Sequence, residues 1–543
     1  MNSLIATSIF ILAVSSVLSH ARAAQLPLLN AVVEGNDKRF GRFLHITDMH
    51  LDPYYEEGAP IATSCHGIAD VLIARKKRPQ TDATAGKYGT PGSGCDSPLL
   101  LINETMRFIA GILNAGDKLD FVVWTGDSAR HDSDSRIVRT EGEIQALNAL
   151  AVEFLLGAFP SGGEKGSIPI VPNIGNNDIW PHNDLIYTPS IPNPTLDFYA
   201  TLWKPFIPAD QTEEFRRHGS FAVEVVPNVV VASINTMYLS DGNKQVDDCR
   251  ASKDDPLAAG DDVLQWLANV LNGARQGGKA VYIAGHVPPT PINFYPNCYE
   301  SFSKLMIDYT DVVAGQFYGH MNIDHFFFPT PANAVGEDST STTEQGAIAE
   351  SLRAYMPYFS ASSLAPLTEP LPPHAGGTVG TTIPSWLNLY CHYLIRHYTE
   401  LVHQVKKNPD LRVPQPVFVS PSVVPSFNPS LRVFEYRKSM GDVQSTVGHL
   451  IGYTQYFADI EKWNKRSKIG DMTVQKDEFP GYIYETEYRP GSLYGLEKFD
   501  AEEWLRFGGR MAGIGADKNT AAQLRELYLA NLVVRLKGLK VPV

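Results

Sequence analysis

The sequence predicts an α/β protein in which helices cover a layered core of β-strands. Short apolar runs rich in β-branched residues recur over the first two thirds of the chain, and helical patterns lie between them. The chain has 543 residues, 43% of them hydrophobic, which suffices for one large core or two domains and excludes disorder of the whole.

Five apolar runs have the features of strands that are buried on both faces. Each is short and ends in polar residues, as strands do when helices cover both sides of a sheet. These runs are Phe43 to Thr47, Phe121 to Thr125, Ile168 to Ile174, Val229 to Ile234 and Val281 to Ala284. Helical patterns separate some of them, at Leu99 to Leu113, Glu141 to Leu156 and Asp261 to Ala274.

The composition changes near residue 329. Residues 329–384 are rich in Ser, Thr, Pro, Gly and Ala, and predict a low-complexity surface insertion with one short helix near 348–355. Residues 385–440 predict a helix and two strands that return to the sheet, and residues 441–543 predict a mostly helical C-terminal extension. The elements expected there are helices at 386–405, 501–507 and 520–536 and strands at 416–420 and 431–436.

The N-terminus predicts entry into the secretory pathway. A mostly apolar stretch runs from Leu4 to Leu18, and an alanine-rich ending follows at Ala21 to Ala24, as in a signal peptide over residues 1–24. The usual basic residues are missing before the stretch, and an uncleaved membrane anchor is the alternative. Both interpretations place the rest of the chain on the lumenal or extracellular side, where Asn103 is a candidate N-glycosylation site.

Charge argues against a nucleic-acid partner. The formal net charge is −13, so the chain has no global positive field that would coat an anionic polymer. Any anionic substrate must therefore be bound by a local group of positive charges. The densest basic run, Arg75 to Arg78, is either part of a polyanion groove or a solvated loop face.

The five cysteines form no CxxC pair that would indicate zinc binding or redox activity. In an oxidising compartment four of them can pair. From loop placement we expect Cys65 to pair with Cys95 and Cys249 with Cys298, leaving Cys391.

Residues that commonly bind metals follow four of these five runs, all except Val229 to Ile234, and also follow a further short run, Gln316 to Tyr318. In an open α/β sheet, ligands gather beyond the carboxyl ends of the strands. Two divalent cations about 3.5 to 4 Å apart need a bridging carboxylate, several imidazoles and neutral oxygen donors. The candidates at these five strand ends are Asp48, His50, Asp127, Asn176, Asn177, His286, His320 and Asn322.

The order of these motifs, DxH, GD, GN, GH and GHxN, resembles that of the calcineurin-like metallophosphoesterases. Longer matches at 124–132, 175–183 and 319–325 resemble fungal endopolyphosphatases, which are relatives of acid sphingomyelinase. The resemblance implies a β-sandwich of mixed sheets flanked by helices, with a catalytic domain over 40–328 and return strands within 385–440.

The resemblance also implies roles for individual residues. Asp48 and His50 would bind one metal and Asp127 would bridge the pair, whereas Asn176, His286 and His320 would complete the second site. Such mixed ligands admit Zn, Mn, Fe, Co or Mg.

Two positions depart from the family pattern, since Asn177 and Asn322 stand where most relatives have histidine. Asn322 is either a metal ligand or a hydrogen-bonding neighbour, and His325 is the alternative ligand. Asn177 cannot act as a general acid. This favours a phosphoanhydride substrate, because a phosphate leaving group departs with little protonation. His131 is the remaining candidate acid and Arg130 a candidate phosphate contact.

The sequence therefore predicts an endopolyphosphatase that uses water activated by two metals and forms no covalent intermediate. The alternatives are a sphingomyelinase-like phosphodiesterase and a lumenal protein that binds metal or phosphate with little activity. The resemblance implies the vacuole, in its lumen or on the lumenal face of its membrane, with secretion as the alternative. The oligomeric state stays open.

Overall fold

The computed structural model describes residues 39–67, 83–114, 118–159, 168–250, 257–331, 385–438, 446–469 and 477–536. The predicted signal peptide or anchor at 1–24 and the basic run at 75–78 lie outside the described residues. So do nearly all of the predicted insertion at 329–384 and its short helix.

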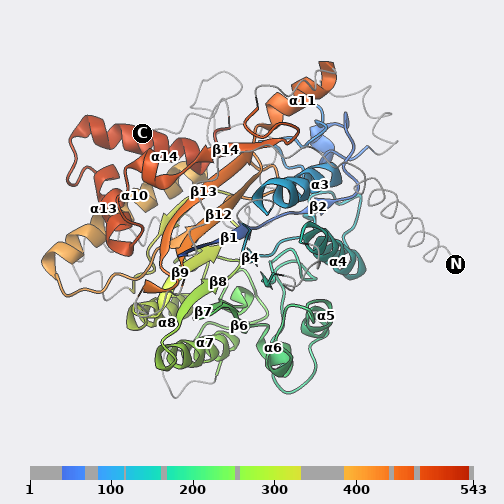
Figure 1. Ribbon diagram of the computed structural model, residues 1–543. Helices are drawn as coiled ribbons and strands as arrows, with labels where there is room; N and C mark the ends of the chain where they lie inside the picture. Colours follow the sequence, from blue (N-terminus) through green and yellow to red (C-terminus); the bar gives the residue numbers. More distant parts are fainter. Residues whose placement is uncertain are drawn as a thin grey trace, which may run out of the picture. The chain divides into compact units, whose positions relative to one another are not determined.

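Two six-stranded sheets form the core, which confirms the predicted layered fold with mixed sheets (Figure 1). The first sheet has the order β14-β13-β12-β1-β4-β5, and β1, β4 and β5 are parallel to one another. Its strands are β1 Phe40–Ile46, β4 Phe121–Trp124, β5 Ile170–Pro172, β12 Ser430–Arg437, β13 Leu450–Ala458 and β14 Tyr484–Tyr488.

The second sheet has the order β10-β11-β9-β8-β7-β6, and β7, β8, β9 and β11 run parallel. Its strands are β6 Phe221–Val226, β7 Val229–Ser233, β8 Ala280–Ala284, β9 Val313–Tyr318, β10 His325–Phe327 and β11 Val417–Val419. Each of the two return strands thus joins a different sheet, β11 beside β9 and β12 beside β1.

Aromatic side chains fill the space between the sheets. The fully buried ring of Phe43 in β1 lies 5.2 Å from that of Phe317 in β9 and 5.4 Å from that of Tyr282 in β8. Within its own sheet it stacks on Phe121 at 4.6 Å and on Phe434 at 5.1 Å. Because burial of each such ring contributes about 1.5 to 3 kcal/mol, this cluster joins the two sheets firmly.

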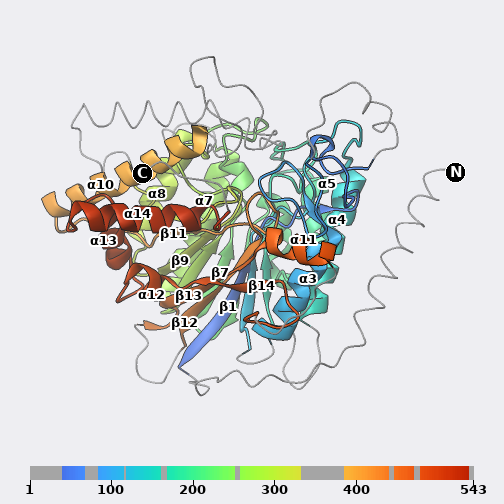
Figure 2. The ribbon, with the colours of Figure 1, turned by 90° about the horizontal axis from the view of Figure 1, so that it is seen from above.

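Two groups of helices enclose the strands, one on either side (Figure 2). On one side lie α3 and α4, and on the other α10, α13 and α14. The first turn of α4 carries Glu141 and Glu143, and the Thr140 side chain caps it by accepting from the Glu143 N–H. The main helices are α3 Leu99–Phe108, α4 Glu141–Ala158, α7 Ala259–Gln276, α8 Pro296–Asp308, α10 Ser385–Lys407, α13 Ala501–Met511 and α14 Lys518–Leu532.

The C-terminal region contains more than the predicted helices. Helices α13 and α14 lie where they were expected, but β13 and β14 extend the first sheet beyond β12. Both strands are rich in tyrosine and phenylalanine, such as Tyr453, Phe457 and Tyr488, which favour a pleated and half-buried surface. The prediction of a mostly helical extension did not include these strands, of which β13 pairs with β12 and β14 pairs with β13.

Both predicted disulfides are present. Cys65 is bonded to Cys95 and Cys249 to Cys298, with S–S distances of 2.01 and 2.05 Å, and Cys391 is a buried thiol. Within the described ranges, no helix combines the length and the apolar character that crossing a bilayer requires.

Candidate active site

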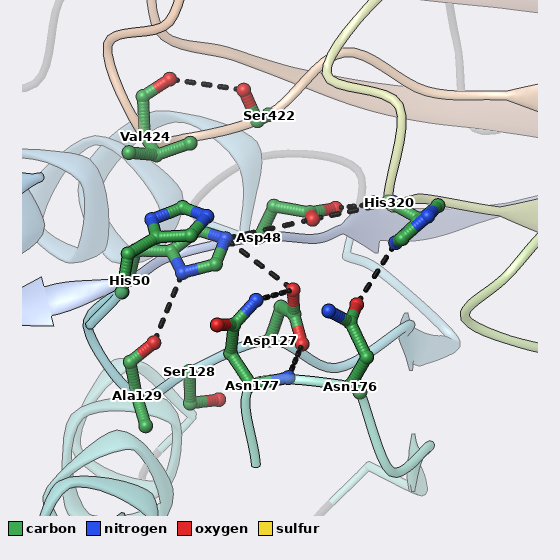
Figure 3. A network of polar contacts seen from close by, with 12 residues as sticks. Asp48, His50, Asp127, Ser128, Ala129, Asn176, Asn177, His320, Ser422 and Val424 are labelled. Atoms are coloured by element: carbon green, nitrogen blue, oxygen red, sulfur yellow. Dashed lines mark hydrogen bonds and ion pairs between the residues drawn. The ribbon is translucent and has the colours of Figure 1, made fainter. Parts of the chain in front are cut away.

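Loops at the carboxyl ends of parallel strands bring the predicted metal ligands together. Asp48 and His50 follow β1, Asp127 follows β4, and His286 and His320 follow β8 and β9 of the second sheet. Since the two sheets pack face to face, both deliver side chains to one place. Figure 3 shows Asp48, His50, Asp127 and His320 around a common space.

Asp127 belongs to two groups of potential metal ligands. The ligand atoms of Asp48, His50 and Asp127 all lie within 4.8 Å of one another, and so do those of Asp127, His286 and His320. His50 Nε2 is 3.5 Å and His286 Nε2 is 3.3 Å from the same Asp127 oxygen, Oδ2. A carboxylate shared by two ligand groups is the arrangement that a bridging ligand requires.

Asn176 adds a neutral oxygen to the second group. Its Oδ1 lies 2.8 Å from His286 Nε2 and 2.9 Å from His320 Nδ1. Its amide nitrogen lies 2.8 Å from His182 Nε2, so that the amide oxygen faces the site and the nitrogen faces away from it.

The backbone is strained at the candidate ligands. Five of them have left-handed φ values: Asp48 (49°), His50 (40°), Asp127 (54°), His320 (70°) and Asn322 (57°). This conformation costs a residue with a side chain roughly 1 to 3 kcal/mol, and it concentrates at functional sites. Here it aims successive side chains into the space between the sheets.

Two glycines let the loops approach closely. A Cβ atom on Gly175 would lie 2.1 Å from Asp127 Oδ1, and one on Gly319 would lie 2.4 Å from Asp48 Oδ2. No other residue type fits at either position without displacing a carboxylate of the site.

The buried carboxylate of Asp178 holds the Asp127 loop in place. It accepts hydrogen bonds from the backbone N–H groups of Asp127 (2.7 Å), Ser128 (2.8 Å), Ala129 (3.1 Å) and Gly175 (3.0 Å). Burial and the neighbouring Asp127 raise the pKa of Asp178. Asp178 therefore acts as a structural support that joins the second motif to the third.

The charges of the site are coupled. Burial lowers the pKa of His50 and His286, but the Asp48 and Asp127 carboxylates outweigh it and raise each pKa to about 9. Burial and the nearby His286 lower the pKa of His320 to about 4. Protons on His50 and His286 thus balance the carboxylates, and divalent cations would replace those protons.

The donor set fits two divalent metal ions. His50 Nδ1 donates to the Ala129 carbonyl at 2.9 Å and His286 Nδ1 to the Thr125 carbonyl at 2.7 Å, which turns both Nε2 atoms toward Asp127. His50 Nε2 is buried and has no hydrogen-bond partner among the described residues. An orphaned buried nitrogen is costly unless an ion or another ligand satisfies it.

Asn322 is available to a metal, and His325 is engaged elsewhere. The Asn322 Oδ1 atom is buried and accepts no hydrogen bond from the residues that the structure describes. His325 Nε2 lies 2.8 Å from the Tyr390 hydroxyl and Nδ1 lies 3.2 Å from the Ile323 carbonyl. Burial lowers the pKa of His325 to about 3, so its ring is neutral and belongs to the packing of α10 against β10.

His131 lies beside the ligand groups. Its ring stacks on that of His50 with 3.9 Å between centroids. Asp96 holds it twice, with Oδ1 2.6 Å from His131 Nδ1 and Oδ2 accepting from the backbone N–H at 2.7 Å. Asp96 was not among the predicted site residues, because a parallel pairing of Leu51 with Ser97 brings it to His50 across 46 residues of chain.

Arg130 differs from its predicted role as a phosphate contact. Its side chain is almost completely buried, and its Nε and Nη2 donate to Glu143 at 2.6 and 3.1 Å. Nη1 and Nη2 also donate to the carbonyls of His131 and Ile137. With these bonds made, Arg130 stabilises the loop that carries His131 and does not face the ligand groups.

Two further residues singled out from the sequence, Asn177 and Asn103, lie in described parts of the chain. Asn177 donates from its backbone N–H to Asp127 Oδ1 and from its amide to Oδ2, both at 2.8 Å. Asn103 lies half-buried on α3, and its glycosylation stays a prediction.

Comparison with known proteins identifies the family. The calcineurin-like phosphoesterase family model matches residues 41–324. The chain is 32% identical to an endopolyphosphatase of Saccharomyces cerevisiae over 483 residues, 82% of this chain and 68% of that protein. It is 35% identical to an endopolyphosphatase of Cryptococcus neoformans over 83% of this chain and 68% of that protein. The corresponding protein of Candida glabrata is 37% identical over 75% of this chain and 62% of its own length. The chain therefore belongs to the calcineurin-like phosphoesterases, a family of metal-dependent hydrolases, and is similar there to the fungal endopolyphosphatases.

Proposed function

We propose that this protein is an endopolyphosphatase, which hydrolyses internal phosphoanhydride bonds of inorganic polyphosphate with two divalent metal ions. The observation that carries the proposal is Asp127, whose carboxylate is common to two groups of potential metal ligands in a chain similar to endopolyphosphatases.

The ligands divide between the two sheets. Asp48 and His50 of the first sheet would hold one ion, and His286 and His320 of the second sheet, with Asn176, would hold the other, while Asp127 serves both. When bound, two such ions supply an activated water and offset the charge of the phosphoryl oxygens. Asn322, whose Oδ1 has no partner within the described ranges, would be a further ligand.

The need of the leaving group for a proton favours a phosphoanhydride over a phosphoester as the substrate. The Asn177 amide donates to Asp127 Oδ2 and has no ionisable proton. A phosphate leaving group needs little protonation, whereas an alkoxide needs a full proton. His131, partly exposed and held by Asp96, would donate a hydrogen bond or a proton to a departing phosphate.

A size-resolved cleavage assay tests the proposal. Purified protein incubated with long-chain polyphosphate and a divalent metal should yield intermediate and short chains on a gel before much free phosphate appears. Asp127→Asn should lose at least about 10³-fold in rate, because the shared ligand is weakened. Release of monophosphate alone from the chain ends would contradict the endo mode. Faster cleavage of a chromogenic phosphodiester than of polyphosphate would favour the phosphodiesterase alternative.

We further infer that the protein acts in the vacuole, in its lumen or at the lumenal face of its membrane. The two disulfides support folding in an oxidising compartment. Fractionation of vacuoles followed by carbonate washing would separate a lumenal protein from one anchored by its N-terminal segment. Recovery mainly from the medium would favour secretion instead.

A further inference from the structure

A second arginine beside the site, Arg139, carries a positive charge that no carboxylate of the described residues neutralises through an ion pair. Arg139 precedes the cap of α4, and only 6% of its surface is exposed. Its Nη1 donates to three oxygens: the Arg130 carbonyl at 2.8 Å, and the carbonyl and the Oδ1 of Asn177, both at 3.2 Å.

These three acceptors are all neutral. The neighbouring arginines differ in this respect, since Arg130 is paired with Glu143 and Arg136 with Asp134. Among the described residues, no carboxylate forms an ion pair with Arg139. Burial of an uncompensated guanidinium is costly, and it lowers the pKa of Arg139 even though Asp132 and Asp127 act in the opposite direction.

The position of Arg139 connects this charge with the reaction. The Asn177 amide donates to Asp127 Oδ2 through its nitrogen, and its oxygen accepts from Arg139. One amide therefore separates the guanidinium from the carboxylate shared by the two ligand groups. Toward the described residues, Arg139 donates from Nη1 alone, so Nε and Nη2 retain N–H groups for a further acceptor.

Polyphosphate differs from an ordinary phosphoester in the charge that flanks the bond being cleaved. Both neighbours of an internal phosphoanhydride bond are anionic phosphates, whereas a diester of an alcohol presents a neutral group on the leaving side. A guanidinium binds phosphate oxygens in a planar, two-pronged manner. It is therefore suited to the anion that the esters lack.

We propose that Arg139 binds the phosphate unit next to the bond being cleaved, and so selects polyphosphate over phosphoesters. This inference rests on the proposed function. Asn177, which stands where most relatives have histidine, contributes to this binding because its side-chain oxygen orients the Arg139 guanidinium.

The test compares two substrates in matched variants. Arg139→Gln should lower kcat/KM for long-chain polyphosphate by about 10- to 100-fold, mainly through KM, because a hydrogen-bonded charge pair is lost. Cleavage of bis(p-nitrophenyl) phosphate should change less than about threefold. Arg139→Lys should be intermediate, since it retains the charge without the planar fork. Arg136→Gln, on the same loop but already paired with Asp134, should leave both substrates unchanged.

Binding supplies a readout that does not depend on turnover. Calorimetry with methylenediphosphonate, which cannot be hydrolysed at its bridge, should show weaker binding to Arg139→Gln than to the unaltered protein. The metal content and the melting temperature of Arg139→Gln should equal those of the unaltered protein. An equal loss on polyphosphate and on the ester, or unchanged affinity for the diphosphonate, would show that Arg139 only supports the loop and would overturn the inference. If the unaltered protein cleaves esters but no polyphosphate, the proposed function fails, and the diphosphonate measurement still decides whether Arg139 binds a second phosphate.

Discussion

Single residues outside the ligand groups set the geometry of the site. The carbonyls of Ala129 and Thr125 fix the rings of His50 and His286. Asp178 organises the loop of Asp127 through four backbone hydrogen bonds. Such neighbours determine how well the ligands are preorganised, since a metal site loses affinity when its supporting bonds are removed.

Replacing Asp178 by asparagine should weaken both the fold and the metal site. An amide has one acceptor oxygen, and its NH2 group would face the backbone N–H donors that the carboxylate now satisfies. We expect the free energy of unfolding in urea to fall by about 2 kcal/mol or more, together with bound metal. Asp184→Asn, which alters a weaker contact to Gln245, is the control and should change neither quantity appreciably. Full retention of metal in Asp178→Asn would contradict this role.

Among the secondary-structure elements, α10 is joined to β10 and its following residue through buried polar contacts. The Tyr390 hydroxyl lies 2.8 Å from His325 Nε2, and the Phe328 N–H donates to His397 Nε2 at 3.3 Å. Burial lowers the pKa of His325 to about 3 and that of His397 to about 4, so both rings are neutral in the folded protein. The packing of this helix therefore depends on histidines that stay unprotonated.

The pH dependence of stability should reflect His397. Its folded pKa of about 4 lies below the value of 6.5 expected in the unfolded chain, so its contribution is complete above pH 6.5 and is lost as the pH falls toward 4. Between pH 7 and 5 this single group should remove about 2 kcal/mol of unfolding free energy. His397→Gln keeps an acceptor for the Phe328 N–H and should lose correspondingly less over that range.

His392 provides the matched control for this measurement, because it lies exposed on the same helix. His392→Gln should leave the pH profile of unfolding unchanged. Identical profiles for His397→Gln and the unaltered protein would show that another group causes the loss at low pH.

Across the whole molecule, the site connects the two sheets. Asp48, His50 and Asp127 come from the first sheet, and His286 and His320 come from the second. Bound ions would therefore cross-link the layers that the aromatic core already joins, and metal binding should contribute to global stability.

Removal of metal should lower the melting temperature. At a free metal concentration 100 times its Kd, each ion adds about 2.7 kcal/mol to the free energy of unfolding, which a chelator removes and excess metal restores. Differential scanning calorimetry with and without a chelator measures the shift. Asp127→Asn should melt at nearly the same temperature in both conditions, and an equally large shift in that variant would place the stabilising ion elsewhere.

Local sequence patterns were enough to predict much of the fold and most of the residues that gather at the candidate metal site. The expected strands correspond to β1, β4, β5, β7 and β8, because buried strands are continuous apolar runs. The ligand residues follow strand ends directly, so the direction of parallel strands alone brings them together. The short strand β10 was not predicted, since it pairs with β11, which lies far away in the chain. The strands β13 and β14 were not predicted either, although each pairs with the preceding strand of the same sheet.

By itself, the sequence determined the layered fold, the family and the residues that meet between the sheets, because each of these depends on short segments with fixed periodicity. Only the tertiary structure decided the roles of Asp96, Arg130 and Arg139. Their functions depend on which acceptor each side chain reaches. Pairing of Leu51 with Ser97 brings Asp96 to His131, and the packing of α4 gives Arg130 the carboxylate of Glu143. Arg139 forms no ion pair with a carboxylate in the part of the chain that the structure describes.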